Sequence, residues 1–392
     1  MKSRVKDISL QWLKLVEGDR QIWMVLIILS LFSVPVVMSS INMLADKYDT
    51  SPFIFLGQHL RNISIALLIT FICHRLPSKF YNKWAFVVYI FSIGLLLYTA
   101  LFADDLNSAR RWIDIPLLGL SFQPSDFAKV ALLMLLAQRI SSKQLVIKKV
   151  GEAFKPIFIP VAISLILIIP FDLSTALLLF VVVFAIMFVG RMNLGLLMGI
   201  VALGLVLFSS IYMIGEKYNS LIRSETWTSR VVNFMDRDAV PDHQVLMRNQ
   251  AISNGGLFGV GPGKGLNKNY FNSPFTDFIY AVICEEFGLL GALLVVMLYL
   301  WFFWRVVVMI FRSERAFGAI LAFGLAFLIV LQAMVNMLVT LDMLPSTGIP
   351  LPMISLGGTS NMITGAAFGI ILSISKDFKK EQKKREEHES VG

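Results

Sequence analysis

Residues 277–303 read DFIYAVICEEFGLLGALLVVMLYLWFF, and this stretch decides the class of fold. A helix needs ~20 mostly apolar residues to cross the hydrocarbon core of a bilayer, and this stretch meets that length. The same rule predicts nine further spans. They cover residues 21–43, 55–75, 83–102, 124–139, 155–171, 173–190, 192–214, 317–340 and 353–375. We therefore predict an all-α polytopic membrane protein, a bundle of ten transmembrane helices.

The composition agrees with a membrane bundle and not with several soluble domains. Of the 392 residues, 56% are hydrophobic and 16% are charged, whereas soluble domains have roughly 45–50% and about 25%. We predict one membrane domain over residues 1–375 and a basic cytoplasmic tail over 376–392. A large outer loop, 215–276, joins the seventh and eighth spans. Loops of this length are usually either functional or disordered. Trp227 and a predicted helix around Val245–Ile252 indicate that this loop is folded.

Lys and Arg residues gather on one side of the predicted bundle. The segments before the first span and after the last span are rich in them, whereas the short loops on the other side hold chiefly Lys47, Arg110 and Arg111. The positive-inside rule then puts both termini in the cytoplasm. The net charge of +9 is mostly a result of this topology and does not predict a nucleic-acid partner. The tail 376–392 either touches anionic lipid headgroups or is a solvated flank.

Polar groups recur at the predicted outer boundary of the membrane. Pro124 suits the first turn of a helix, which makes Asp126 and Lys129 i,i+3 neighbours on one face. A Lys one turn into a membrane helix must pair, snorkel or face water. The two side chains therefore form either a self-contained ion pair or part of a ligand cavity.

Residues 344–361 bring three prolines and three glycines into an otherwise apolar region. Irregular backbone at membrane depth is tolerated where protein buries it or where it lines a wet cavity. Ser355, Thr359 and Ser360 offer hydroxyls, and Gly358 allows close approach of a ligand. The alternative is that the small residues only let helices pack closely.

Asp277 lies where the outer loop turns into an apolar helix. A carboxylate at a membrane boundary is costly, so it is a functional hypothesis by default. Glu285 and Glu286 lie roughly 12–14 Å deeper along the same helix, and successive residues are about 100° apart, so both cannot face one cavity. We expect one of these glutamates to be a hydrogen-bonded anchor in the bundle interior, in preference to a catalytic group.

The segment Gly259–Gly265 reads GVGPGKG and is superficially similar to a phosphate-binding glycine loop. It lacks the strand–loop–helix context and the Lys-Ser/Thr ending of such loops. We predict a flexible turn in a re-entrant loop instead. The four histidines show no metal-ligand spacing, so a zinc or haem site is not predicted.

These motifs, in this order, resemble the SEDS family (shape, elongation, division and sporulation). They are ARRWI at 109–113, FQPSDFAK at 122–129, GGLFGVG at 255–261, TDFIYA at 276–281 with EEFG at 285–288, and the stretch 344–360. The resemblance covers nearly the whole chain. Residues 18–20 and 234–250 are more similar to the division-type branch of the family than to the elongation type.

The resemblance implies an inverting peptidoglycan glycosyltransferase that polymerises lipid II at the outer face of the bacterial cytoplasmic membrane. It also implies a class B penicillin-binding protein (a transpeptidase) and other division proteins as partners at the septum. Asp277 matches the catalytic aspartate of the family, and Mg²⁺ or Mn²⁺ becomes a candidate cofactor. The pattern departs from the family at 272–275, which reads NSPF in place of Pro-Glu-x-His, at Asp126, where Glu is commoner, and at Asp172, which lacks its usual neighbouring Glu.

Glycosyl transfer from a lipid diphosphate needs a base for the attacking hydroxyl and cations for the departing diphosphate. Asp277 is the predicted base, and Arg110, Arg111 and Lys129 are the predicted clamp. The predicted substrate-binding residues are Arg110, Arg111, Trp112, Gln123, Asp126, Lys129, Ser355, Gly358, Thr359 and Ser360. Two other functions stay open, a lipid II transporter (flippase) and a non-catalytic division scaffold. A transporter needs a polar route through the membrane, so polar groups concentrated on the outer side favour the enzyme.

Overall fold

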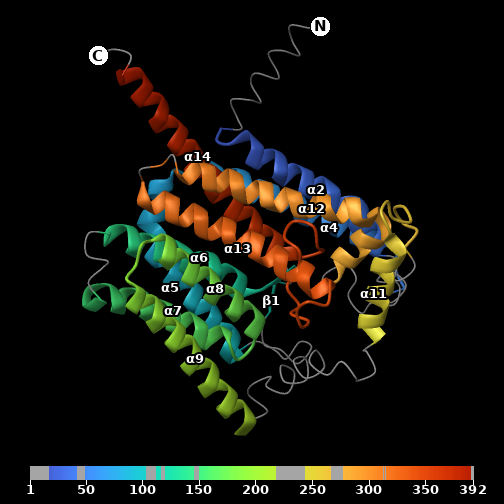
Figure 1. Cartoon of the computed structure of the whole chain (residues 1–392), viewed down its shortest axis with the longest axis horizontal. Coiled ribbons are helices and arrows are strands. Elements are labelled where there is room, and N and C mark those ends of the chain that lie inside the picture. The colour runs from blue at the N-terminus through green and yellow to red at the C-terminus, as the bar shows by residue number, and fades with distance from the viewer. Residues whose placement is uncertain are drawn as a thin grey trace.

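The computed structural model describes residues 17–41, 49–102, 112–115, 120–144, 150–217, 243–265, 277–311, 313 and 315–389. Ten helices correspond in position to the ten predicted spans (Figure 1). They are α2 (Arg20–Ser40), α4 (Pro52–Arg75), α5 (Ser78–Phe102), α6 (Pro124–Ser142), α7 (Val150–Ile168), α8 (Leu173–Val189), α9 (Leu194–Lys217), α12 (Ile279–Phe311), α13 (Ala316–Thr340) and α14 (Gly358–Glu389). The helix predicted inside the outer loop is present as α11 (His243–Gly255).

Length and composition support membrane crossing for six of the described helices, namely α2, α4, α5, α12, α13 and α14. Three shorter apolar stretches follow, Lys155–Ile168, Leu173–Val189 and Leu197–Val206. Helix α6 carries Asp126, Lys129 and Arg139 along its 19 residues. A polytopic helical bundle is therefore established, and the number of ten crossings stays a prediction.

Helix α13 joins the two halves of the bundle. Figure 1 shows α2, α12 and α14 on one side of it and α6 to α9 on the other. It contacts α12 and α14 in the first group and α6 and α8 in the second. Its buried face is almost wholly apolar, apart from Gln332, Asn336 and Thr340 toward its C-terminal end. A polar group that α13 carries into the core therefore meets elements from both halves.

Helices α4 and α14 pack through small residues. A Cβ atom added at Gly365 would lie 2.5 Å from the carbonyl oxygen of Ala66, and one at Gly369 would lie 2.5 Å from that of Thr70. The Thr70 hydroxyl donates a hydrogen bond of 2.8 Å to the carbonyl of Gly365. Because lipid tails are as apolar as the helices, such close backbone approach is a main source of helix association in membranes.

A small β-hairpin departs from the all-α prediction. Strands β1 (Ile113–Ile115) and β2 (Leu120–Phe122) pair antiparallel, with Ile113 opposite Phe122. The hairpin leads directly into α6, and the Thr359 hydroxyl at the start of α14 donates to the carbonyl of Ser121 at 2.8 Å. The hairpin thus ties the entrance of α6 to the entrance of α14.

Helix α12 is broken at Gly288, whereas the sequence predicts one continuous helix over 277–303. Gly288 has φ 66° and ψ −167°, which takes the backbone out of the helical region. A side chain here would be strained by the positive φ. It would also clash, since its Cβ would lie 2.4 Å from the nitrogen of Gly259.

The glycine-rich segment after α11 supplies the hydrogen bonds that the broken helix lacks. The N–H groups of Val260 and Gly261 donate to the carbonyls of Glu285 and Glu286, each at 3.0 Å. In return, the N–H groups of residues 289 and 290 donate to the carbonyls of residues 256 and 257 at 2.9 and 3.2 Å. The turn that the sequence predicts in this segment therefore lies in backbone contact with α12.

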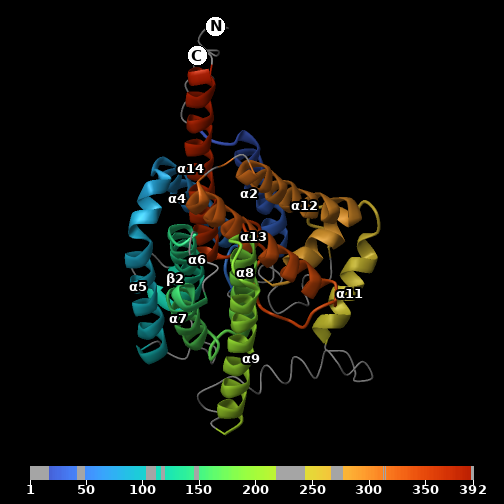
Figure 2. The same cartoon turned by 60° about the vertical axis from the view of Figure 1, so that its left-hand side comes forward.

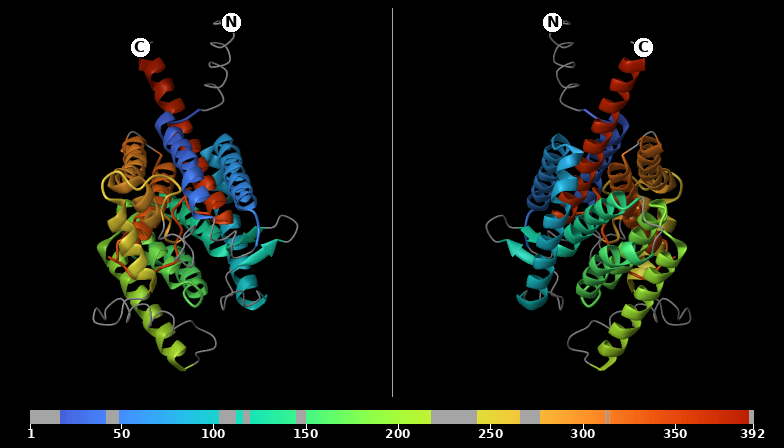
Figure 3. Two further views of the ribbon diagram at one scale, coloured as in Figure 1. Left: turned by 90° about the vertical axis from the view of Figure 1, so that its right-hand side faces the viewer. Right: turned by 90° about the vertical axis from the view of Figure 1, so that its left-hand side faces the viewer.

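Helix α14 runs without a break from Gly358 to Glu389 and so continues into the predicted tail. The first residues of the tail contact the residues just before α2. Lys376 lies 2.9 Å from Glu17, and Lys379 donates to the carbonyl of Gly18 at 2.7 Å. Figures 2 and 3 show α14 leaving the bundle beside the start of α2, at the end opposite the tip of α9. We call this the termini end of the bundle.

We predict that Gly288→Ala destabilises the protein. The positive φ and the contact with Gly259 add strain and overpacking, each costing about 1–3 kcal/mol. Gly94→Ala in α5 is the matched control, since a Cβ there meets nothing within 4 Å. Thermal unfolding of both variants in detergent should show a clear drop only for Gly288→Ala. Equal unfolding temperatures would mean that the break does not need glycine.

Candidate functional site

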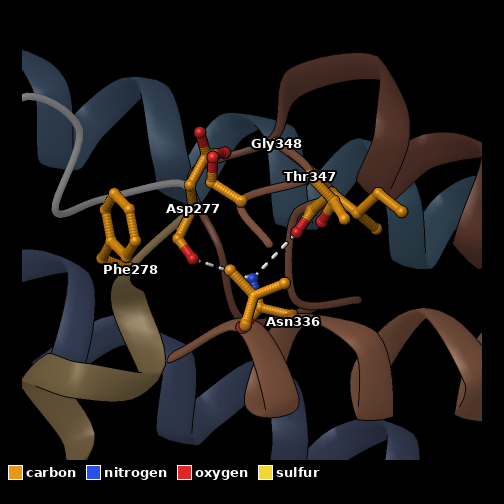
Figure 4. A pocket seen from close by; sticks show the side chains of 8 residues that line it. Asp277, Phe278, Asn336, Thr347 and Gly348 are labelled. Atoms are coloured by element: carbon orange, nitrogen blue, oxygen red, sulfur yellow. Dashed lines mark hydrogen bonds between the residues drawn. The ribbon is translucent and has the colours of Figure 1, made fainter. Parts of the chain in front are cut away.

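Asp277 lines a cavity of about 100 Å³ at the start of α12. The other lining residues come from the same turn, from α13 and from the segment after α13. They are Phe278, Asn336, Val339, Ser346, Thr347, Gly348 and Ile349. In Figure 4 the Asp277 carboxylate lies beside Gly348 and points away from Asn336. We call this the Asp277 cavity.

Asn336 holds the two sides of the Asp277 cavity together. Its Nδ2 donates to the carbonyl of Asp277 at 3.0 Å and to the carbonyl of Ile349 at 2.8 Å (Figure 4). Its side chain is 1% exposed, so these bonds form in a setting of low polarity where a hydrogen bond is strong. One carboxamide on α13 thus fixes both the turn that carries Asp277 and the opposite wall. No motif in the sequence points to this residue.

Arg248 on α11 is a buried cation next to the same cavity. It is 3% exposed. Its Nη1 donates to the carbonyl of Val339 at 2.8 Å, and its Nη2 lies 2.5 Å from Asp342. Its guanidinium lies 6.0 Å from the ring centre of Phe278. Burial lowers the pKa of Arg248, and the Asp342 carboxylate opposes that shift. Arg248 therefore joins α11 to the end of α13. It also lies over the ring of Phe278, which follows Asp277 in the chain.

Asp126 and Lys129 form the predicted pair, with Nζ 2.7 Å from Oδ1 and side chains 9% and 4% exposed. They line a separate cavity of about 10 Å³ together with Gln332 of α13 and Ser360 of α14. None of its lining residues lines the Asp277 cavity. The pair is a buried ion pair at the junction of three helices, and its contact with a substrate stays a prediction.

The predicted hydroxyl groups of 344–361 are largely used within the fold. Ser355 is fully buried, and its Oγ accepts the N–H of Leu351 at 2.8 Å. Thr359 donates to the β-hairpin, and Gly358 begins α14. The hydroxyl-bearing residues that line the Asp277 cavity are instead Ser346 and Thr347. Substrate binding by Ser355, Gly358, Thr359 and Ser360 stays a prediction.

Gln123 and Trp112 flank the β-hairpin. Gln123 Nε2 donates to Ser125 Oγ at 3.0 Å and to Asp172 Oδ2 at 3.3 Å. Asp172 in turn caps α8, since its Oδ1 accepts the N–H of Thr175 at 3.1 Å. Trp112 is 36% exposed just before β1. Arg110 and Arg111, the predicted diphosphate clamp, lie outside the described residues.

Glu285 and Glu286 are each 1% exposed in the half of α12 before the break. The Ser39 hydroxyl of α2 donates to Oε1 of Glu286. The Glu285 carboxylate points toward the glycine-rich segment, where a Cβ at Gly265 would lie 2.7 Å from its Oε2. The two carboxylates therefore face different partners, as the spacing predicts. The contact with Ser39 makes Glu286 the one that fits the predicted anchor.

A metal site is not evident within the described residues. They contain no group of three or more His, Cys, Asp or Glu side chains that could hold an ion. Asp277 is the one carboxylate among the residues given above for its cavity. These residues alone do not make a ligand set for the expected Mg²⁺ or Mn²⁺.

We predict that Lys129→Met lowers the unfolding temperature, because Asp126 keeps its charge in a buried place without its partner. Removing one member of a buried pair costs about 3–5 kcal/mol. The double variant Asp126→Asn/Lys129→Met removes both charges and should recover most of the loss. Thermal unfolding of the three proteins in detergent is the measurement, and a double variant as unstable as the single one would contradict the prediction.

We predict that Arg248→Met loosens α11, because hydrogen bonds to a charged group contribute about 1.5–3 kcal/mol. Asp342→Asn is the milder control, since an amide oxygen still accepts from the guanidinium. Hydrogen–deuterium exchange of peptides from residues 243–255 should speed up strongly in Arg248→Met and weakly in Asp342→Asn. Unchanged exchange in Arg248→Met would show that other contacts hold α11.

Known proteins are similar to this chain over almost its full length. A relative from a Geobacter species, named "Probable peptidoglycan glycosyltransferase FtsW", is 30% identical over 369 residues, which cover 92% of this chain and 97% of the relative. A relative of the same name from Haemophilus influenzae is 28% identical, covering 92% of this chain and 90% of the relative.

Solved structures share the fold. A chain from "Structural coordination of polymerization and crosslinking by a peptidoglycan synthase complex" has a TM-score of 0.73 at 23% identity, covering 92% of this chain and 98% of that one. The rod shape determining protein RodA of Thermus thermophilus has a TM-score of 0.62 at 25% identity, covering 90% and 96%. The family model described as "Cell cycle protein" matches residues 19–380. The chain therefore belongs to the FtsW/RodA/SpoVE family of cell cycle proteins.

Proposed function

We propose that the chain is a peptidoglycan glycosyltransferase that polymerises lipid II during cell division, with Asp277 as its general base. The observation that supports this most is a partly buried carboxylate lining a cavity at the start of a membrane helix. The curated relatives that match the whole chain carry the name of this activity. A substrate with a long polyprenyl tail also explains why a helix bundle carries the site. The tail stays in lipid, the sugar reaches water, and the diphosphate lies at the boundary between them.

The chemical step replaces one bond at an anomeric carbon with another. The hydroxyl of one disaccharide attacks the anomeric carbon of the lipid-linked chain, and the bond from that carbon to the diphosphate oxygen breaks. Asp277 accepts the proton of the attacking hydroxyl, and the lipid diphosphate leaves with the bonding electron pair. A base in this position is typically worth about 10²–10⁴ in rate. Attack from the side opposite the diphosphate inverts the configuration.

The diphosphate needs positive charge as it leaves. Arg110 and Arg111 are the proposed bidentate donors. Lys129 is the third proposed cation, although its charge is already balanced by Asp126 at 2.7 Å. Full polymerisation by the double variant Asp126→Asn/Lys129→Met would remove Lys129 from the clamp and leave it a structural role.

A flippase is the main rival function, because the bundle interior holds several polar side chains. Ser33 bonds to His59 at 2.9 Å between α2 and α4, and Ser39 bonds to Glu286. These side chains are each no more than 5% exposed and bond in two separate pairs. Buried, mutually bonded groups suit helix packing better than an open route for a charged headgroup, so the enzyme is preferred.

The partner and the orientation complete the proposal. One structural neighbour comes from a complex that couples polymerization to crosslinking, which supports a class B penicillin-binding protein as the partner of this chain. The Lys- and Arg-rich termini end supports cytoplasmic termini, with the Asp277 cavity on the outer face. The septum and other division proteins follow from the similarity to FtsW.

We predict that Asp277→Asn leaves under ~1% of the polymerising activity, since the amide keeps the shape of the carboxylate but cannot take the proton. Lipid II binding and the unfolding temperature should change little, because the side chain faces a cavity. The measurement is polymerisation of labelled lipid II by purified protein, with and without the transpeptidase partner.

Glu286→Gln is the matched control, an equivalent change at a buried carboxylate. It should reduce stability at least as much as activity, because Glu286 bonds to Ser39 in the core. Near wild-type polymerisation by Asp277→Asn would reject the general-base role, and the flippase or the scaffold would become the better hypothesis.

A further inference from the structure

A larger cavity, of about 280 Å³, lies at the termini end of the bundle, far from the start of α12. Its walls come from the α4–α5 turn, from the start of α13 and from the part of α14 that leaves the bundle. The lining residues are Pro77, Lys79, Arg315, Asp377, Lys380, Glu381 and Lys384. We call this the basic cavity. Four of its side chains are cationic and two are anionic.

Both carboxylates of the basic cavity are already used by the fold. Asp377 caps α5, because its Oδ2 accepts the N–H of Ser78 at 2.8 Å and the Ser78 hydroxyl at 2.5 Å. Glu381 pairs with Arg315 at the start of α13. These bonds join α14 to its two neighbours. They leave little negative charge to neutralise the lysines.

The lysines keep uncompensated charge. No ion pair or hydrogen bond joins Lys79 or Lys384 to another residue in the part of the chain that the structure describes. Lys380 lies 3.4 Å from Glu17, but Lys376 lies closer to that carboxylate, at 2.9 Å. The hydrogen bond from Lys376 lowers the pKa of Glu17, so this single negative charge is shared by two lysines. The basic cavity therefore has a net positive charge and room for an anion.

Aromatic side chains put the basic cavity at the level of lipid headgroups. Phe80 and Trp84 follow Lys79 on the first turns of α5 and are 40% and 42% exposed. Trp304, toward the same end of α12, is 64% exposed. Exposed Trp residues near the ends of apolar helices mark the boundary between hydrocarbon and headgroups. A free anion makes no contact with these apolar rings, whereas the acyl chains of a lipid can pack against them.

We propose that the basic cavity binds the phosphate of an anionic phospholipid headgroup. Lys79 and Lys384 face the phosphate from two sides, and Arg315 adds guanidinium N–H groups that Glu381 leaves available. Clusters of basic residues on the cytoplasmic side of membrane helices commonly recognise such headgroups. The acyl chains lie along the apolar surface of α5. The bound lipid joins the first turn of α5 to α14 and so steadies the helix that leaves the bundle.

The test uses the full chain purified in detergent with short-chain lipids. Phosphatidylglycerol should raise its unfolding temperature, and phosphatidylcholine and inorganic phosphate at the same concentration should not. The variant Lys79→Gln/Lys384→Gln should bind phosphatidylglycerol about 25-fold more weakly, since each lysine near an anionic surface contributes about fivefold. Both lysines are exposed, so the changes should not disturb folding.

The control variant is Lys83→Gln/Lys383→Gln, which removes the same charge from the same two helices outside the basic cavity. It should bind phosphatidylglycerol like the wild type. Equal weakening in both double variants would mean a general surface charge and would overturn the site. Equal stabilisation by inorganic phosphate would overturn the lipid and indicate a free phosphate ligand. Wild-type affinity in Lys79→Gln/Lys384→Gln would overturn both.

Discussion

The backbone hydrogen bonds exchanged around Gly288 fix how α11, the glycine-rich segment and α12 lie together. A helix interrupted within a membrane leaves carbonyl and N–H groups that lipid cannot satisfy. Here the segment after α11 takes up these groups on both sides of the break. The fit requires contact between backbones, which is why Gly259 and Gly288 meet without side chains. Because α11 leads directly into this segment, the break also fixes where α11 lies and hence where Arg248 can reach.

The helices were predictable because the bilayer imposes a simple rule on sequence. Each long apolar window has a corresponding helix, and the predicted helix around Val245–Ile252 ends at Gly255. The break in α12 was not predictable, since Gly288 lies in an apolar run that equally well continues a helix. The glycines of GVGPGKG indicate an irregular segment, but the residues to which it bonds lie more than twenty positions further along the chain. The local sequence pattern predicts the conformation of such a segment but not the distant residues to which it bonds.

In the candidate site, too, some residues could be predicted from the sequence and others could not. Asp277 was predictable because charge at a membrane boundary is costly and because its motif matches a known family. Asn336 was not, since an amide within an apolar helix looks like a packing group until its two carbonyl partners are known. The sequence predicts the hydroxyls of Ser355 and Thr359 in the site because they lie in an irregular segment. In the structure Ser355 accepts the N–H of Leu351 within that segment, and Thr359 donates to the carbonyl of Ser121 in the β-hairpin. Buried polar groups generally need such partners.

The break also explains how two glutamates can lie next to each other in the core. They occupy the last turn of a half-helix, where the macrodipole is negative and a carboxylate is unfavourable. The N–H groups of Val260 and Gly261 bond to the carbonyls of these same two residues, which reduces the negative potential at that helix end. The carboxylates then point to different neighbours, Glu286 toward Ser39 and Glu285 toward Gly265. At the other end of the half-helix, Asp277 lies near the positive end of the dipole, where a negative charge is favoured. A short, capped half-helix thus provides a place for the proposed general base at its start and for two buried carboxylates at its end.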